Sequence, residues 1–121
     1  MTQQIKEILV ELQQTIAVNG ALLMLHDGTV VAESLDESFD VEMVSGLTSF
    51  LTSTLHRALG DGEMGGFTSF NIHSTHGRML IVDLGEAYLV VLTNQFGSFS
   101  VGMPEIQDAT IQLRRLSRIS I

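Results

Sequence analysis

The chain lacks cysteine and tryptophan altogether, and its 121 residues include one proline and one tyrosine. The absence of cysteine excludes disulfide bonds and thiolate metal sites, and it fits a reducing compartment. No uninterrupted apolar run approaches the roughly 18 residues that a membrane-spanning helix requires. The polar start, Met1-Thr2-Gln3-Gln4, lacks the basic and apolar regions of a signal peptide. We therefore expect a cytoplasmic protein without membrane insertion.

Basic residues are also scarce, because 6 Lys and Arg stand against 14 Asp and Glu, for a net charge of −8. Proteins that bind nucleic acid neutralise phosphates with clustered lysine and arginine, so no nucleic-acid partner is expected. Between residues 27 and 63 the only basic residue is Arg57, and such an acidic segment mostly confers solubility. Arg114, Arg115 and Arg118 lie near the C-terminus, where their charge suits the end of a helix.

The length predicts a single domain, residues 1–121, with room for one hydrophobic core and not for two. Apolar residues recur at helical spacing near both ends of the chain. They predict a first helix and a last helix, with Pro104 in the first turn of the last one. The predicted buried residues are Ile5, Ile8, Leu9, Leu12 and Ile16 in the first helix, and Ile106, Ala109, Leu113 and Leu116 in the last.

Five strands are predicted between these helices. Asp27-Gly28 between two apolar segments indicates a tight hairpin, in which both turn positions need a positive φ. The run from Ala21 to Leu25 does not alternate, so we expect helices on both faces of the sheet. The strand that begins at Phe67 is more polar and is expected at an edge. The predicted strands are Ala21–His26, Thr29–Ser34, Phe67–Ser74, Arg78–Leu84 and Ala87–Thr93, with a loop over residues 94–97.

A long middle helix is predicted over residues 41–59, capped by Asp40 and ended by Gly60. Helical periodicity places one apolar stripe toward the sheet, with a flank beside it. The remaining face carries small polar residues where a solvated helix normally carries Lys and Glu, so it is predicted to pack against another protein or under its own loops. The stripe is Val44, Leu47, Leu51, Leu55 and Ala58, the flank is Met43, Gly46, Phe50, Thr54 and Arg57, and the small polar face is Ser45, Ser49, Ser53 and His56.

These elements predict an α+β fold, in which a five-stranded antiparallel sheet has the two terminal helices on one face and the middle helix on the other. Over nearly its whole length the pattern resembles the Roadblock/dynein light-chain family, a profilin-like architecture. The stretches that carry this resemblance are residues 20–28 with Val30-Val31-Ala32, the helix 41–59, residues 77–82 and residues 88–92.

The resemblance implies a homodimer, in which the middle helices pack together and the edge strands join into one continuous sheet. Members of this family commonly bind Ras-like small GTPases as regulators or scaffolds, or act as adaptors of motor complexes. The residues assigned to dimer contacts are Met43, Gly46, Phe50 and Thr54 on the helix and Phe67, Ser69 and Asn71 on the edge strand. Those assigned to the GTPase surface are Ser45, Ser49, Ser53 and Arg57.

Candidate catalytic and metal-binding residues all have a simpler interpretation. His73 and His76 lack supporting cysteine or carboxylate ligands, so they are interpreted as turn residues. The middle-helix serines lack a nucleophile elbow, and residues 62–66 lack the Gly-Lys-Ser/Thr ending that binds phosphate. Arg57 can stabilise phosphoryl charge, but a solvated charge or an ion pair across the dimer is the plainer interpretation. We therefore expect no enzyme, catalytic residue, metal or cofactor.

The leading hypothesis is a homodimeric Roadblock-type regulator or scaffold of a Ras-like small GTPase. One alternative is an adaptor in a larger complex that is indifferent to nucleotide state. The other is a small-ligand sensor of profilin- or PAS-like fold, which needs an apolar cavity between the sheet and the middle helix. These hypotheses differ in whether nucleotide state or a small ligand changes what the protein binds.

Overall fold

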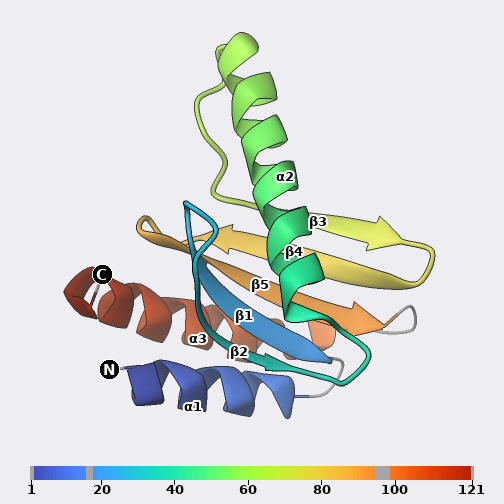
Figure 1. Cartoon of the computed structure of the whole chain (residues 1–121), viewed down its shortest axis with the longest axis vertical. Coiled ribbons are helices and arrows are strands. Elements are labelled where there is room, and N and C mark those ends of the chain that lie inside the picture. The colour runs from blue at the N-terminus through green and yellow to red at the C-terminus, as the bar shows by residue number, and fades with distance from the viewer. Residues whose placement is uncertain (1, 16–17, 95–98, 121) are drawn as a thin grey trace.

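The computed structural model describes residues 2–15, 18–94 and 99–120, so Ile16 of the predicted first helix and positions 95–97 of the predicted loop lie outside it. Three helices and five strands follow each other in the predicted order (Figure 1). They are α1 (Thr2–Gln13), β1 (Gly20–Leu25), β2 (Val30–Leu35), α2 (Val41–Asp61), β3 (Ser69–Ser74), β4 (Gly77–Asp83), β5 (Ala87–Asn94) and α3 (Phe99–Ser120).

The five strands form one antiparallel sheet in the order β2-β1-β5-β4-β3. β5 lies at its centre, where it pairs with β1 on one side and β4 on the other. Every residue of β5 from Ala87 to Thr93 is buried, as a strand covered on both faces must be. The predicted edge position of the polar third strand is confirmed, because β3 lies at the end of the sheet.

The sheet separates two hydrophobic clusters, and successive residues of a strand point to opposite clusters. Leu23 packs in the cluster shared with α1 and α3, whereas its neighbour Leu22 packs in the cluster shared with α2. Figure 1 shows the same arrangement, with α1 and α3 together on one face and α2 crossing the other. The predicted fold class, including the placement of all three helices, is therefore confirmed.

The turn between β1 and β2 differs from the predicted hairpin. Gly28 has φ of 99°, but Asp27 does not share a positive φ, since Glu63 is the only non-glycine residue of the described chain with one. Asp27 instead accepts a hydrogen bond from the backbone N–H of Thr29 through Oδ1, at 2.9 Å. This bond lowers the pKa of the Asp27 carboxyl below its ordinary value. The carboxylate therefore closes the turn that a second positive φ was expected to close.

The ends of the long helices test the sequence signals directly. Asp40 caps α2 as predicted, because Oδ1 accepts from the N–H of Glu42 at 2.8 Å. The helix continues past Gly60 and ends at Asp61, with Gly62 as its C-cap. α3 begins at Phe99, so Pro104 lies inside the helix, and its predicted place in the first turn is wrong.

Candidate protein–protein interface

Two of the three α2 residues that are buried against the sheet are threonines. The three residues are Val44, Thr48 and Thr52. The Thr48 hydroxyl donates to the carbonyl of Val44 at 2.8 Å, and the Thr52 hydroxyl donates to that of Thr48 at 2.9 Å. Because these bonds satisfy both hydroxyls within the helix, the two side chains can be buried against an apolar sheet.

This rotation of α2 corrects the predicted inward stripe. Leu47 is 46% exposed and Ala58 is exposed, although helical periodicity placed both toward the sheet. Leu51 and Leu55 are half-buried. The leucines were assigned inward by hydropathy alone, which does not count the bonds that a threonine can make to its own helix.

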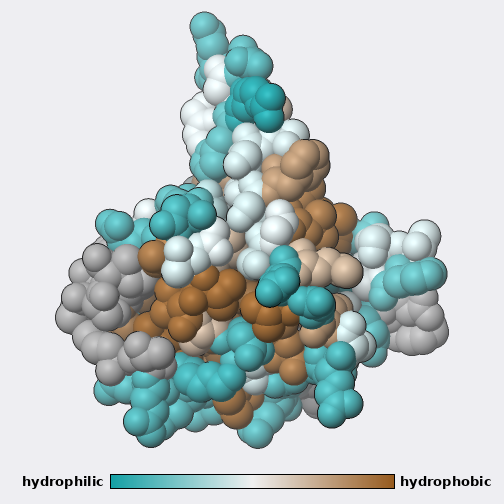
Figure 2. All heavy atoms as spheres, in the orientation of Figure 1, coloured by the Kyte–Doolittle hydropathy of each residue, from teal (hydrophilic) through white to brown (hydrophobic). Residues whose placement is uncertain are grey.

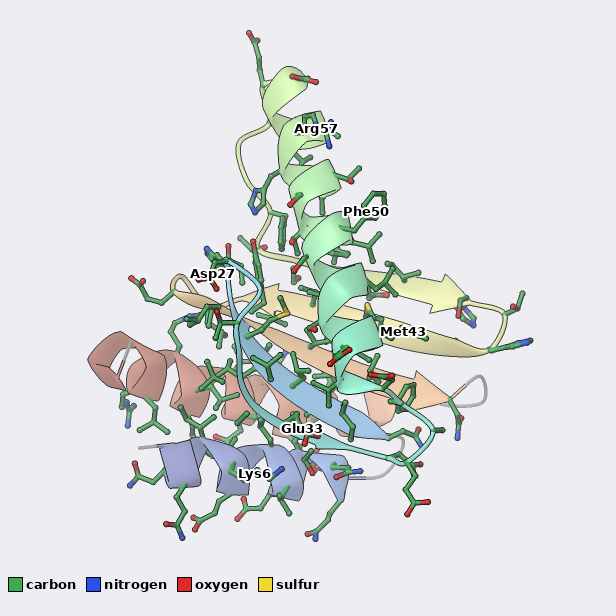
Figure 3. All side chains as sticks on the ribbon, viewed as in Figure 1. Lys6, Asp27, Glu33, Met43, Phe50 and Arg57 are labelled. Carbon is green, nitrogen blue, oxygen red and sulfur yellow. The ribbon has the colours of Figure 1, made fainter. Side chains whose placement is uncertain are left out.

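The apolar side chains that turn outward form one surface, which we call the apolar flank of α2. It consists of Met43, Leu47 and Phe50, which are 70%, 46% and 67% exposed. Met43 and Phe50 project to the same side of the helix (Figure 3). Figure 2 shows apolar surface along that side and polar surface at the projecting end of the helix. Large apolar side chains gathered on one exposed surface are typical of a protein–protein contact.

The apolar flank continues into a groove beside the helix. This groove has a volume of about 290 Å³ and lies between the first half of α2 and the hairpin of β3 and β4. Met43, Leu47 and Ile72 are among the residues that line it. Phe70 of β3 is half-buried against the cluster beneath α2, and Ile72 is half-buried where it lines the groove. The outer strands thus provide an apolar surface that α2 itself does not cover. We call this surface, formed by Phe70 and Ile72, the apolar shelf.

The two edges of the sheet are protected differently. α1 lies beside β2, where Lys6 forms a hydrogen bond with the carbonyl of Glu33 and the Ser34 hydroxyl donates to Oε1 of Gln13. At the other end of the sheet, β3 pairs with β4 only, within the part of the chain that the structure describes. Ser69 and Asn71 of β3 are exposed. β3 is therefore the open edge, with backbone groups available to a further strand.

The predicted partner-binding residues do not share one environment. Ser53 and Arg57 are exposed, and Arg57 lies on the part of α2 that projects beyond the sheet (Figure 3). Ser45 and Ser49 are half-buried. Ser49 lies against the β1–β2 turn, since a Cβ on Gly28 would stand 3.3 Å from its Oγ. Of the remaining helix residues assigned to the dimer, Gly46 and Thr54 are both exposed.

A cluster of aromatic and histidine side chains, which the sequence did not predict, attaches α2 to the sheet. Tyr88 stacks on His26, with 4.2 Å between the ring centroids, and its hydroxyl lies 3.1 Å from Nε2 of His56. Nε2 of His26 lies 3.2 Å from Oδ1 of Asp83. Phe67, which the sequence assigned to the dimer contact, packs its ring 4.7 Å from that of His56. Burial raises the pKa of the Tyr88 hydroxyl.

The part of the chain that the structure describes holds neither a metal-binding cluster nor a membrane-spanning helix. Within residues 2–15, 18–94 and 99–120, no group of three or more His, Cys, Asp or Glu is arranged to hold a metal ion. Among the helices of that same part of the chain, none combines the length and apolar character that crossing a membrane requires.

Comparison with known proteins gives relatives of similar sequence. The uncharacterized proteins MJ0310 and MJ1340 of Methanocaldococcus jannaschii are each 36% identical to this chain over 90 residues. The matched region covers 74% of this chain and 79% of each relative. No protein-family profile matches the sequence.

Solved structures of similar fold include bacterial proteins. Myxococcus xanthus MglB superposes with a TM-score of 0.88 at 13% identity, covering 99% of this chain and 92% of that chain. A Roadblock/LC7 domain from Streptomyces avermitilis gives a TM-score of 0.79 at 20% identity, covering 93% and 97%. A further MglB structure, with a tetrameric arrangement, gives 0.86 at 14% identity, covering 99% and 92%. At these identities the likeness is one of fold.

Proposed function

This chain belongs to the family of those Methanocaldococcus jannaschii proteins and is a Roadblock-type domain, and from this premise we propose that it forms a homodimer that binds a Ras-like small GTPase. In this proposal the protein acts in the cytoplasm as a regulator or scaffold and is not itself an enzyme. The observation that carries it is the apolar flank of α2 beside the open edge of β3.

The homodimer is supported by two surfaces that need a partner. An antiparallel β3–β3 pair satisfies the free backbone groups of both edges and makes one continuous sheet. It also places the second copy's α2 over the apolar shelf, where Met43, Leu47 and Phe50 of both copies become buried. Ser69 and Asn71 then lie at the seam of the sheet, as the sequence assigned them.

The projecting half of α2 supports a second partner. All buried residues of α2 precede Ser53, so the segment 53–61 extends beyond the sheet (Figure 1). It presents the exposed Ser53 and Arg57, whereas its two leucines, Leu55 and Leu59, are half-buried. A polar surface of this kind suits a reversible partner, and the family resemblance implies that this partner is a small GTPase. If GTP hydrolysis is stimulated, the protein acts by positioning the GTPase's own residues.

The test has two readouts. Light scattering after size exclusion should give the mass of a dimer. The tagged protein should then capture one small GTPase from lysate of its source organism in only one of two parallel samples, one with GDP and one with a non-hydrolysable GTP analogue. Equal capture in both samples would instead support the nucleotide-independent adaptor. A dimer that captures no protein, but whose melting temperature rises with a metabolite, would support the small-ligand sensor.

A further inference from the structure

A second groove lies on the opposite face of the sheet, between α3 and the outer strands β4 and β3. It has a volume of about 530 Å³. Leu80 on β4 and Ser69 and Asn71 on β3 form its floor, and α3 forms its wall. The floor is open because α1 and α3 cover β2, β1 and β5 and leave β3 bare. This groove takes no part in the proposed α2 contact, which lies on the other side of the sheet.

The wall of this groove carries exposed apolar surface. Ile111 of α3 is 56% exposed, although it belongs to a helix whose inner face is fully packed on the sheet. Met103, two turns earlier on the helix, is half-buried and lines the same groove. Exposed serine and asparagine side chains provide hydrogen-bonding groups on the floor. The groove is therefore amphipathic, with an apolar wall and a polar floor.

The charge of this groove is opposite to that of the chain. Among the described residues that line it there is no Asp or Glu, and Arg114 stands at one end, where its Nη2 also donates to the backbone carbonyl of Asp83 at 3.4 Å. The neighbouring groove between α1 and α3 is lined by Glu11, Glu105 and Asp108. In a chain of net charge −8, a groove with arginine and no carboxylate is a local site for negative charge.

Pairing through β3 turns two such grooves into one trough, and this step rests on the proposed homodimer. β5 and its symmetry mate are then separated by five strand spacings, which at about 4.8 Å each is about 24 Å. α3 packs on β5, and a helix with its side chains is about 10 Å across, so the space between the two α3 helices is about the width of one more helix. The two Ile111 side chains face each other across that space.

We propose that this trough binds one acidic amphipathic helix of another protein. Its apolar side chains contact Ile111 of both copies, and its carboxylates lie near the Arg114 guanidinium at each end. The trough is too open to enclose a small molecule, which normally has most of its surface buried in a pocket. A second copy of this chain is a poor occupant, because its own α3 already forms a wall.

The experiment starts from the intact protein. A photo-crosslinking amino acid is placed at Ile111 and, as a control, at the adjacent Gln112, which lines the grooves between α1 and α3. After irradiation in cells of the source organism, the cross-linked peptide is identified by mass spectrometry. The expected adduct forms at position 111 and not at 112. It joins the chain to an acidic segment of a different protein with apolar residues at helical spacing.

The synthetic form of that segment is then titrated into the purified dimer. One peptide should bind per dimer, and Ile111→Asp and Arg114→Glu should each weaken binding at least tenfold. Arg115→Glu is the matched control, because it makes the same charge change on the α1 side of α3 and should leave the affinity within about twofold. Equal weakening by both arginine variants would mean that net charge alone drives binding, and it would overturn the proposal.

The remaining outcomes separate this proposal from the proposed function. A dimeric protein with no adduct at position 111, or with an adduct to a second copy, a small molecule or a basic segment, overturns the acidic-helix proposal and leaves the dimer standing. A protein that light scattering shows to be a monomer contradicts the homodimer, and the trough is then lost with it.

Discussion

Nε2 of His56, on the projecting half of α2, lies 3.1 Å from the hydroxyl oxygen of Tyr88 on β5. Phe67 contacts both rings: it is tilted against His56, with 4.7 Å between the centroids, and stacked on Tyr88, with 5.8 Å between them. A helix end that passes beyond the sheet cannot be held by burial alone. The contacts of His56 with Tyr88 and Phe67 attach the projecting half of α2 to the sheet. They also hold Phe67, which lies just before β3.

The first prediction concerns the ionisation of Tyr88. Burial raises the pKa of its hydroxyl above the ordinary value of 10.0, because the phenolate loses hydration inside the cluster. Tyr88 is the only tyrosine, so the ultraviolet absorbance of phenolate reports this group alone. The folded protein should titrate at a higher pH than the same protein in concentrated urea. Coincident titration curves would contradict the burial of this hydroxyl.

The same shift sets how stability depends on pH. Below pH 10 the hydroxyl is protonated in both states and contributes no pH dependence. Above pH 10 the unfolded state releases its proton first, so the free energy of unfolding falls as the pH rises. Tyr88→Phe should remove this part of the alkaline slope while lowering stability at neutral pH by about 1 kcal/mol, the typical net value of one hydrogen bond. Urea unfolding at several pH values measures both effects.

The second prediction concerns Gly28. Its φ of 99° is strained for any other residue, and a Cβ there would stand 3.3 Å from Oγ of Ser49. Gly28→Ala should lower the free energy of unfolding by about 1–3 kcal/mol, measured by urea denaturation. Gly85→Ala is the matched control, because φ there is 101° and a Cβ would meet nothing within 4 Å. If Gly28→Ala lowers the free energy of unfolding no more than Gly85→Ala does, the contact of the added Cβ with Ser49 does not destabilise the fold.

The order of elements and the layers could be predicted from local signals. Asp40 precedes an apolar helical run, and such a cap acts within three residues of its own position. The more polar composition of residues 67–74 likewise placed this strand at the edge. These features depend on neighbours in sequence, so the sequence alone contains them.

Neither the choice of the α2 face that is buried against the sheet nor the cluster around Tyr88 could be predicted in the same way. Hydropathy ranks leucine above threonine, yet Thr48 is buried and Leu47 is exposed, because the hydroxyl is satisfied inside the helix. The cluster joins His26, His56 and Tyr88, and its first and last members are 62 residues apart in the sequence. Its partners become neighbours only when the sheet order brings β1 beside β5.

The third prediction compares two glycines of α2, Gly46 and Gly60, of which only Gly46 is assigned to the dimer contact. A Cβ on Gly46 or on Gly60 would meet nothing within 4 Å in the single chain. Alanine at either site should therefore stabilise the isolated helix by about 0.5–1 kcal/mol. Gly46 is assigned to the contact between the two copies of α2. There the methyl group added by alanine would push the two helix backbones apart. Gly46→Ala should raise the dimer dissociation constant, and Gly60→Ala should not, as measured by sedimentation velocity. If the Gly46→Ala and Gly60→Ala dimers have equal dissociation constants, Gly46 does not lie in the contact.

The last prediction concerns Phe50, which is 67% exposed in the single chain. Phe50→Asp should leave the fold intact, because the ring contributes little to either hydrophobic cluster. Its burial in the dimer is worth about 1.5–3 kcal/mol per copy, so losing both rings should weaken the dimer by about two to four orders of magnitude. Light scattering and circular dichroism should therefore show a folded monomer at micromolar concentration.

Met64→Asp controls for added charge at an exposed apolar site. Met64 is 73% exposed and lies in the segment after α2, away from the apolar flank, so this variant should remain a dimer. The Phe50→Asp monomer should also lose capture of the GTPase if both copies of α2 form the partner surface. A monomer that still captures the GTPase in a nucleotide-dependent way would mean that one projecting helix is sufficient. An intact Phe50→Asp dimer would instead move the contact away from the apolar flank, because a carboxylate cannot be buried there without a partner.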